Sequence, residues 1–212
     1  MDNVKNYTVL PLFSTPVYVS HIDLEFSNIV NHVHNVECVT IPSGLGLRSK
    51  DPYILNQPEL SELKKLVDDN ITIYTRDILC VKNTTEFYIT NSWIYKTDPE
   101  GFGMPHLHSN SILSGVVYLN QDYTNSGDIV FDKQNRLTVF TPSIEPELDS
   151  FSIFNSSEWC IKPNQKMIVL FPSHLYHRVT KNNTNQSRYS IAFNVFVKGV
   201  ISHESEIGVL IL

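Results

Sequence analysis

Hydrophobic residues recur at steps of three and four positions in one long part of the chain, between Leu60 and Ile78. This spacing matches the period of an α-helix, and Pro58 and Glu59 ahead of it are favourable in a first helical turn. The positions that carry the pattern are Leu60, Leu63, Leu66, Val67, Ile71, Tyr74 and Ile78. We therefore expect an amphipathic helix of about five turns over 60–78. A shorter helix is expected over 24–33, where four apolar residues share a face.

From residue 87 onward the pattern changes to short runs rich in β-branched and aromatic residues, separated by Pro, Gly, Asn and Asp. Such runs predict strands. They are Phe87–Tyr95, Ile112–Leu119, Ile129–Phe131, Leu137–Phe140, Met167–Phe171 and Tyr189–Val197. Short strands that follow a helical N-terminal part are typical of a jelly-roll core, with the helices supporting a sheet. The polar, proline-bearing stretch 142–157 predicts a long loop or lid over the open end of the barrel.

The length and composition favour one domain over residues 1–212. With 212 residues and 42% hydrophobic content, two domains would each have only a small core. We divide the domain into an N-terminal part with supporting helices (1–86), a jelly-roll core (87–200) and a C-terminal tail (201–212). The apolar end of this tail, Ile207–Leu212, predicts a terminal strand packed on the body. The alternative is a contact with a second subunit in a homodimer.

The charge of the chain argues against nucleic acid as a partner. The net charge is −6, and only five arginines are present, whereas neutralising phosphates requires clustered Lys and Arg. No basic N-terminal region precedes an apolar stretch, and no segment approaches about eighteen consecutive apolar residues. We expect a soluble, cytoplasmic protein without a membrane partner. Cys38, Cys80 and Cys160 are odd in number and widely spaced, so we expect buried free thiols.

Three histidines have the spacing of a metal site. His106 and His108 lie two residues apart, so in an extended segment their imidazoles point the same way, and His177 from a distant strand can close one face of an ion. Arg188 follows His177 by eleven positions and precedes Ser190 by two, at the start of an apolar run. A guanidinium there can hold a carboxylate bidentately. The pattern predicts a redox metal and an acidic co-substrate.

The same residues carry a resemblance to a known family. Phe171-Pro172-Ser173 to His177, followed by Arg188-Tyr189-Ser190-Ile191-Ala192-Phe193-Asn194, resembles the C-terminal signature of Fe(II)/2-oxoglutarate-dependent oxygenases. His106-Leu107-His108-Ser109-Asn110-Ser111, with Ser114 to Leu119 and Leu12 to Val17, resembles an uncharacterised branch that has two histidines where most relatives have His-x-Asp or His-x-Glu. The resemblance implies a mainly β fold with flanking helices, a double-stranded β-helix (jelly roll, cupin-like). It also implies Fe(II), with 2-oxoglutarate and O2 as co-substrates.

The resemblance also implies roles for seven residues. His106, His108 and His177 would be the metal ligands of the catalytic centre, and Arg188 would bind the distal C5 carboxylate of 2-oxoglutarate. Ser190 shares the strand face of Arg188 and can donate a second hydrogen bond. The Tyr118 hydroxyl would contact the same co-substrate, with core packing as an equal alternative, and Asn194 would line the site.

Three alternatives remain open from the sequence. His108 occupies the slot of a carboxylate, so another residue or water could complete the metal site in its place. A three-histidine cupin-like dioxygenase would bind its substrate directly to iron without 2-oxoglutarate. A metal-binding jelly-roll protein without turnover is the third. Arg188-x-Ser190 favours a 2-oxoglutarate-dependent dioxygenase, which hydroxylates an unidentified substrate and releases succinate and CO2.

Overall fold

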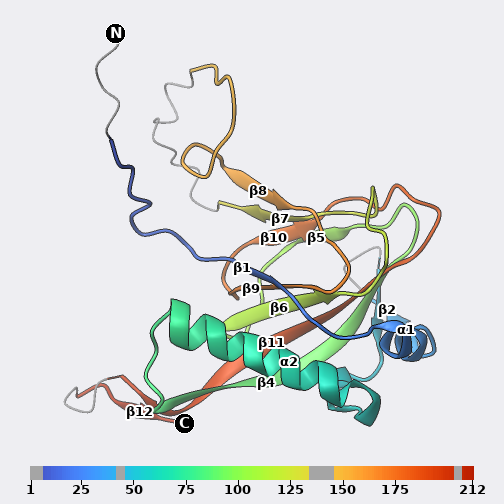
Figure 1. The fold of residues 1–212 in the computed structure, drawn as a ribbon, viewed down its shortest axis with the longest axis horizontal. Coiled ribbons are helices and arrows are strands. Elements are labelled where there is room, and N and C mark those ends of the chain that lie inside the picture. The colour runs from blue at the N-terminus through green and yellow to red at the C-terminus, as the bar shows by residue number, and fades with distance from the viewer. Residues whose placement is uncertain (1–6, 42–45, 134–145, 203–206) are drawn as a thin grey trace.

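The computed structural model describes residues 7–41, 46–133, 146–202 and 207–212 of the chain. Two antiparallel β-sheets face each other, and the helices pack on the outer face of the larger sheet (Figure 1). In Figure 1 the smaller sheet lies above the larger sheet, and the helix α2 lies in the lower part of the view, where it overlaps β11 and β4. This arrangement confirms the predicted mainly β jelly roll.

Within the described residues, eight strands form the larger sheet and four form the smaller one. In spatial order the larger sheet contains β1 (Tyr18–His21), β9 (Met167–Pro172), β6 (Leu113–Tyr118), β11 (Arg188–Ile201), β4 (Thr85–Thr97), β3 (Leu47–Ser49) and β2 (Cys38–Thr40), with β12 (Leu210–Ile211) paired to β11. The smaller sheet contains β5 (Gly103–His106), β10 (His177–Val179), β7 (Ile129–Asp132) and β8 (Glu158–Ile161).

Both predicted helices are present. They are α1 (Ser27–His34) and α2 (Ser61–Ile73), the latter preceded by the 3-10 turns η1 (Ile54–Asn56) and η2 (Pro58–Leu60). The predicted helix ends as a π-helical turn, η3 (Tyr74–Ile78). At this junction the Thr75 hydroxyl donates to the Ile71 carbonyl, 2.8 Å away, and so competes with the amide that would continue the α-helix.

Alternate residues of the central strands face two different cores. In β11, Ile191 and Phe193 join the helices in one cluster, whereas Arg188 and Ser190 line a cavity between the two sheets. A second apolar cluster, which includes Phe131 of the smaller sheet, fills the rest of the space between the sheets. Because these strands are covered on both faces, their sequences are nearly continuously apolar.

The N-terminal part contributes more to the sheet than the sequence predicted. Strands β1, β2 and β3 all come from residues 1–86, where we expected only supporting helices. Each has only three or four residues, too few to show an alternating pattern. The predicted strand over 137–140 and residues 142–145 of the predicted loop lie outside the described residues. Residues 146–157 contain no helix or strand, as expected of a loop.

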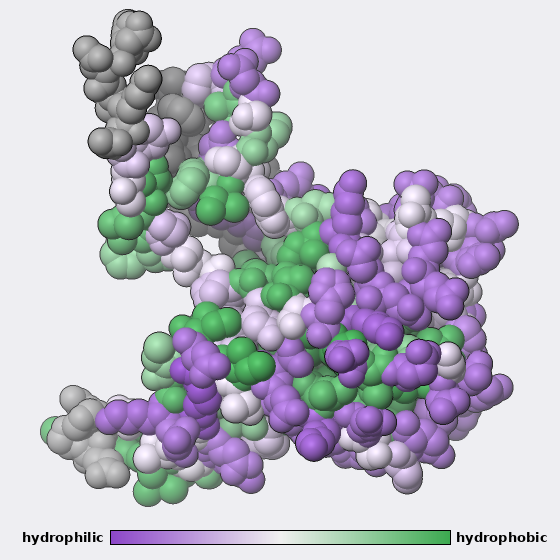
Figure 2. Space-filling view, in the orientation of Figure 1, coloured by the Kyte–Doolittle hydropathy of each residue, from purple (hydrophilic) through white to green (hydrophobic). Residues whose placement is uncertain are grey.

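The C-terminal tail forms the expected terminal strand, since β12 pairs with β11. Its side chains nevertheless stay exposed, with Ile211 at 74%. Figure 2 shows hydrophobic side chains on the two projections at its left, where the N-terminal segment and this tail lie; Leu12 and Phe13 are among the exposed residues. None of the helices in the described ranges is both long and apolar enough to cross a membrane.

The prediction of buried cysteines is wrong. All three thiols are free, but Cys80 and Cys160 are exposed and Cys38 is half-buried. Cys160 lies on β8, an edge strand with solvent on one side, and Cys80 follows the last helical turn in a left-handed conformation (φ 54°). Residue type alone suggested burial, whereas the position at an edge or a helix end decided the exposure.

Candidate metal centre and its cavity

Neighbouring strands of the smaller sheet bring the three predicted histidines together. His177 of β10 lies directly opposite His106 of β5, and His108 follows two residues after the end of β5. The ring centroids are 4.4 Å apart for His106 and His177, 5.1 Å for His108 and His177, and 5.2 Å for His106 and His108. One potential ligand atom from each residue lies within 4.8 Å of the others. The three residues therefore form a cluster that could hold a metal ion.

Hydrogen bonds leave the same nitrogen of each imidazole free. Nδ1 of His106 lies 2.7 Å from the Met104 carbonyl oxygen, and Nδ1 of His177 lies 2.9 Å from the Leu175 carbonyl oxygen. A carbonyl only accepts, so each Nδ1 carries the proton and each Nε2 keeps a lone pair. Ligating histidines in proteins commonly have this arrangement, in which the second nitrogen donates to an oxygen. The donor set therefore fits a metal ion.

His108 is oriented by a chain of buried polar side chains instead of a backbone carbonyl. Its Nδ1 lies 2.5 Å from Asn194 Oδ1, which also accepts from Ser114 Oγ at 2.9 Å. Ser114 in turn contacts Ser173, 2.8 Å away, and Ser111 donates to Ser173 at 2.6 Å. Ser114 and Ser173 are buried, so the chain is held inside the protein. Asn194 thus presents its oxygen to His108, and its position in β11 fixes the direction of the ring.

Burial favours the neutral form of His108 and His177. Removal from water, together with the nearby His106, lowers the pKa of His177 to about 3. Burial also lowers the pKa of His108, although the hydrogen bond to Asn194 opposes this effect. A metal ion binds only the deprotonated nitrogen, so burial favours the metal-binding form of both residues in the folded protein.

A cavity of about 640 Å³ between the two sheets opens onto the histidines. All the site residues predicted from the sequence line it except Asn194, which lies behind His108. The predicted residues that line it are His106, His108, His177, Tyr118, Arg188 and Ser190. Because Arg188 and Ser190 are two positions apart on β11, they share one strand face, as the sequence indicated.

Arg188 is buried without an anionic partner. Only 1% of it is exposed, and its Nε and Nη1 have no hydrogen-bond partner among the described residues. Its guanidinium carbon lies over the rings of Tyr118 and Tyr123, 5.3 and 5.7 Å from their centroids. Burial raises the pKa of Tyr118, so its phenol is neutral beside the arginine. A buried guanidinium with free donors is costly unless an anion binds it, so the chemistry of this end of the cavity fits a carboxylate.

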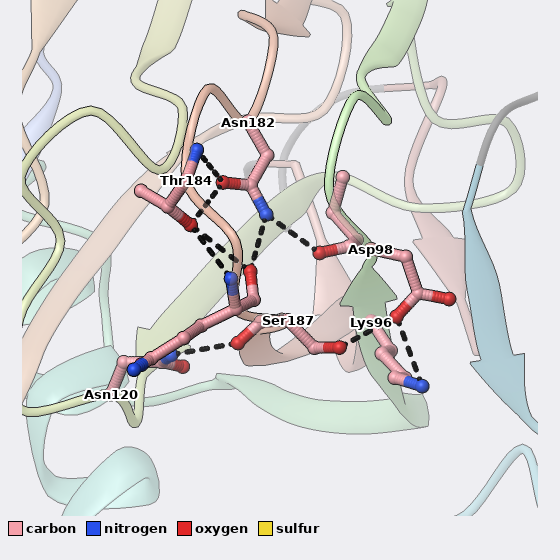
Figure 3. Close-up of polar contacts among 8 residues, drawn as sticks. Lys96, Asp98, Asn120, Asn182, Thr184 and Ser187 are labelled. Atoms are coloured by element: carbon pink, nitrogen blue, oxygen red, sulfur yellow. Dashed lines mark hydrogen bonds and ion pairs between the residues drawn. The ribbon is translucent and has the colours of Figure 1, made fainter.

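The turn that precedes Arg188 is fixed by side chains (Figure 3). Asn182 is fully buried, donates to the carbonyls of Thr97 (3.1 Å) and Gln186 (2.8 Å), and accepts from the Thr184 hydroxyl (2.7 Å). Ser187, the residue before Arg188, donates to Asp98 Oδ1 at 2.6 Å. Since these bonds tie the turn to the end of β4, the arginine enters β11 at one defined position.

The cavity includes residues that the sequence analysis did not single out. Trp93 and Tyr95 of β4 and Arg48 of β3 line it. The alternation of Trp93 and Tyr95 around Ile94 inside a predicted strand was a usable signal, because residues two apart share a face. No local pattern marked Arg48, whose strand has only three residues.

Comparisons with known proteins agree with this geometry. Residues 91–194 match a family model described as "Putative 2OG-Fe(II) oxygenase". No curated protein sequence matches the chain. The matched range contains the three histidines, Arg188, Ser190, Tyr118 and Asn194.

Several solved structures share the fold. An oxidoreductase of the 2OG-Fe(II) oxygenase family from Burkholderia pseudomallei has 16% identity and a TM-score of 0.57, over 81% of this chain and 77% of that one. HygX from Streptomyces hygroscopicus, with nickel and 2-oxoglutarate bound, has 14% identity and a TM-score of 0.59, over 86% and 83%. A Pseudomonas putida prolyl-4-hydroxylase has 15% identity and a TM-score of 0.57, over 85% and 93%. At these low sequence identities, the structural similarity shows only that the fold is shared.

Proposed function

We propose that this chain, a member of the 2OG-Fe(II) oxygenase family by its residues 91–194, is a dioxygenase that hydroxylates an organic substrate and converts 2-oxoglutarate to succinate and CO2. In the balanced reaction, one oxygen atom of O2 enters the new C–OH group and the other enters succinate. The observation that carries the proposal is the buried, unpaired Arg188 beside a three-histidine cluster in one cavity.

Each predicted residue has a role that its surroundings support. His106, His108 and His177 would hold Fe(II) through Nε2, because each Nδ1 is already engaged. Arg188, whose Nε and Nη1 have no partner among the described residues, would bind the distal carboxylate of 2-oxoglutarate through its guanidinium, and Ser190 would add a hydroxyl donor from the same face. The bound iron would supply the oxidative chemistry with O2. The wall of the cavity is largely apolar, which would strengthen these polar contacts once a ligand has displaced the water.

Tyr118 would act on Arg188 and the co-substrate together. Its ring lies under the guanidinium, and because burial raises the pKa of its phenol, the hydroxyl stays protonated and able to donate. Asn194 would orient His108 instead of touching 2-oxoglutarate. The three-histidine dioxygenase without 2-oxoglutarate leaves Arg188 without an anion, which is why we favour the 2-oxoglutarate-dependent reaction.

The test is anaerobic reconstitution with Fe(II), titration with 2-oxoglutarate while the metal-to-ligand charge-transfer band is recorded, and then exposure to O2 with succinate detection.

We expect His177→Ala to lose most bound iron. Arg188→Lys keeps the charge but loses the planar fork, so 2-oxoglutarate affinity should fall by about 1–3 kcal/mol with iron content unchanged. His108→Asp should retain iron and 2-oxoglutarate with a shifted band, and His108→Ala should bind iron more weakly.

Arg178→Lys is the matched control, because Arg178 forms its ion pairs with Asp132 and Glu158 on the smaller sheet and does not line the cavity. It should behave as the wild type. Wild-type 2-oxoglutarate affinity in Arg188→Lys would show that the arginine is structural and would favour the three-histidine dioxygenase. Binding of 2-oxoglutarate without succinate release would instead identify a binding protein.

A further inference from the structure

A row of side chains crosses the larger sheet on its cavity face. Arg48 of β3 pairs with Tyr95 of β4, Tyr95 pairs with Ser190 of β11, and Ser190 pairs with Tyr118 of β6. All four residues line the cavity. Neighbouring strands lie about 4.8 Å apart, so the backbone of Arg48 is about 10 Å from that of Ser190. Arg48 therefore stands at the opposite side of the cavity from the proposed co-substrate pocket of Arg188 and Tyr118.

Arg48 has no anionic partner within the described part of the chain. Its one hydrogen bond there is from Nη1 to the Ser49 carbonyl, 3.2 Å away, and it takes part in no ion pair. No described residue that lines the cavity is acidic, although the protein has 22 acidic residues and a net charge of −6. Two of its five arginines line this one cavity. Among the described residues, the lining of the cavity therefore contains two arginines and no carboxylate, although Arg48 is also exposed to solvent.

The cavity has room for a second ligand beside 2-oxoglutarate. Its volume of about 640 Å³ falls in the range of roughly 300–1,000 Å³ that encloses drug-sized ligands, and 2-oxoglutarate is much smaller. Next to Arg48 and Tyr95, the wall includes Trp93, whose ring stacks near His108 at 5.9 Å between centroids, and Met104 of β5. The Trp93 ring is planar and the Met104 side chain is flexible, so both apolar surfaces can pack against an aromatic or aliphatic group.

We propose that the substrate to be hydroxylated is a small organic acid, with its carboxylate on Arg48 and its apolar body against Trp93 and Met104, close to the metal centre. This proposal rests on the proposed function, because it takes the Arg188 end of the cavity to be filled by 2-oxoglutarate. It assigns Arg48 a role in substrate specificity. A guanidinium and a carboxylate form a charge-assisted pair with directional hydrogen bonds, so a neutral amide of the same shape binds less well.

The test uses matched probes on the anaerobic Fe(II)- and 2-oxoglutarate-loaded protein. Phenylacetate, 3-phenylpropanoate and 4-phenylbutanoate are each compared with the corresponding primary amide by calorimetry, while the charge-transfer band reports whether 2-oxoglutarate stays bound. We expect at least one carboxylate to bind about five- to tenfold more tightly than its amide. Arg48→Gln should abolish this preference, and Arg48→Lys should keep part of it. The 2-oxoglutarate affinity of both variants should equal that of the wild type.

Lys50→Gln is the control, since Lys50 is an exposed cation two residues away that pairs with Glu37 and does not line the cavity. It should keep the full preference. Three results overturn the inference: no carboxylate binds at millimolar concentration, the preference survives Arg48→Gln, or the carboxylates displace 2-oxoglutarate. Absence of a charge-transfer band in the wild type refutes the proposed function instead, so the two failures are distinguishable.

Discussion

At the scale of single residues, the distinctive feature of the centre is His108 in the place of a carboxylate. If the three imidazoles bind a divalent ion, they bring it no negative charge, so more of its charge would be left for an anionic co-substrate to neutralise. The Asn194 oxygen would partly compensate for the missing carboxylate charge. Because it accepts a hydrogen bond from His108 Nδ1–H, it makes Nε2 of the same ring a stronger metal ligand. The buried serines behind Asn194 hold that amide in place.

Removing this acceptor should weaken the metal centre. We expect Asn194→Leu, which keeps the side-chain volume, to lower Ni(II) affinity about 10- to 100-fold by calorimetry, the usual effect of losing such an outer contact. Asn194→Asp should keep or strengthen binding, because a carboxylate accepts the same proton. Ser114→Ala leaves the acceptor in place and should have a smaller effect. Wild-type affinity in Asn194→Leu would show that His108 does not depend on this contact to bind the ion.

At the scale of elements, the turn before β11 determines where Arg188, the proposed co-substrate ligand, lies. The apolar residues of β11 pack against the helices, but they do not fix where the strand begins. Asn182, with two donated hydrogen bonds and one accepted from a hydroxyl, ties this start to Thr97 at the end of β4. The metal ligands lie on other elements, so the turn and the metal centre are separable in experiment.

Asn182→Ala should therefore lower 2-oxoglutarate affinity and leave metal affinity unchanged. The variant leaves buried carbonyls without donors, which should lower the free energy of unfolding by about 1–3 kcal/mol. Urea unfolding measures the stability, and the charge-transfer titration measures the affinity. Asn183→Ala is the neighbouring control, because Asn183 is exposed. Equal loss of metal and 2-oxoglutarate binding in Asn182→Ala would mean that the turn supports the whole cavity.

At the scale of the whole molecule, folding encloses titratable metal ligands between two sheets. Burial lowers the pKa of His177 to about 3, whereas in the unfolded chain an imidazole titrates near its ordinary value of about 6.5. At pH values between these two pKa values, His177 is protonated in the unfolded chain but not in the folded protein. Stability of the metal-free protein must then fall as the pH decreases through this window.

We expect His177→Asn to reduce this pH dependence in the metal-free protein. One such group contributes a slope of at most about 1.4 kcal/mol per pH unit, so the variant should lose stability less steeply between pH 6 and about 4. Urea unfolding with a chelator at several pH values measures the slope. His174→Asn, an exposed substitution on the same segment, should keep the wild-type slope. An unchanged slope in His177→Asn would contradict the burial effect.

Much of the fold and of the centre followed from local patterns in the sequence. The three-and-four spacing from Leu60 gave α2, and apolar runs gave β4, β6, β7, β9 and β11. The two-residue spacings of His106 with His108 and of Arg188 with Ser190 predicted shared directions, which the cavity shows. These predictions succeeded because helix and strand periods are local properties of the backbone.

Other features depended on contacts that no local pattern records. The strands β1 to β3 are too short to show a period, and they form because an existing sheet offers them hydrogen bonds. The partnership of Asn194 with His108 joins residues 86 positions apart in sequence, and the same-face parity of Asn194 with Arg188 suggested a different contact. The sequence by itself thus determined the type of the longer elements, and it predicted the metal-ligand set and the need of Arg188 for an anion. Tertiary structure decided which side chains share the cavity and which orient a ligand, because these depend on strand pairing across the sheets.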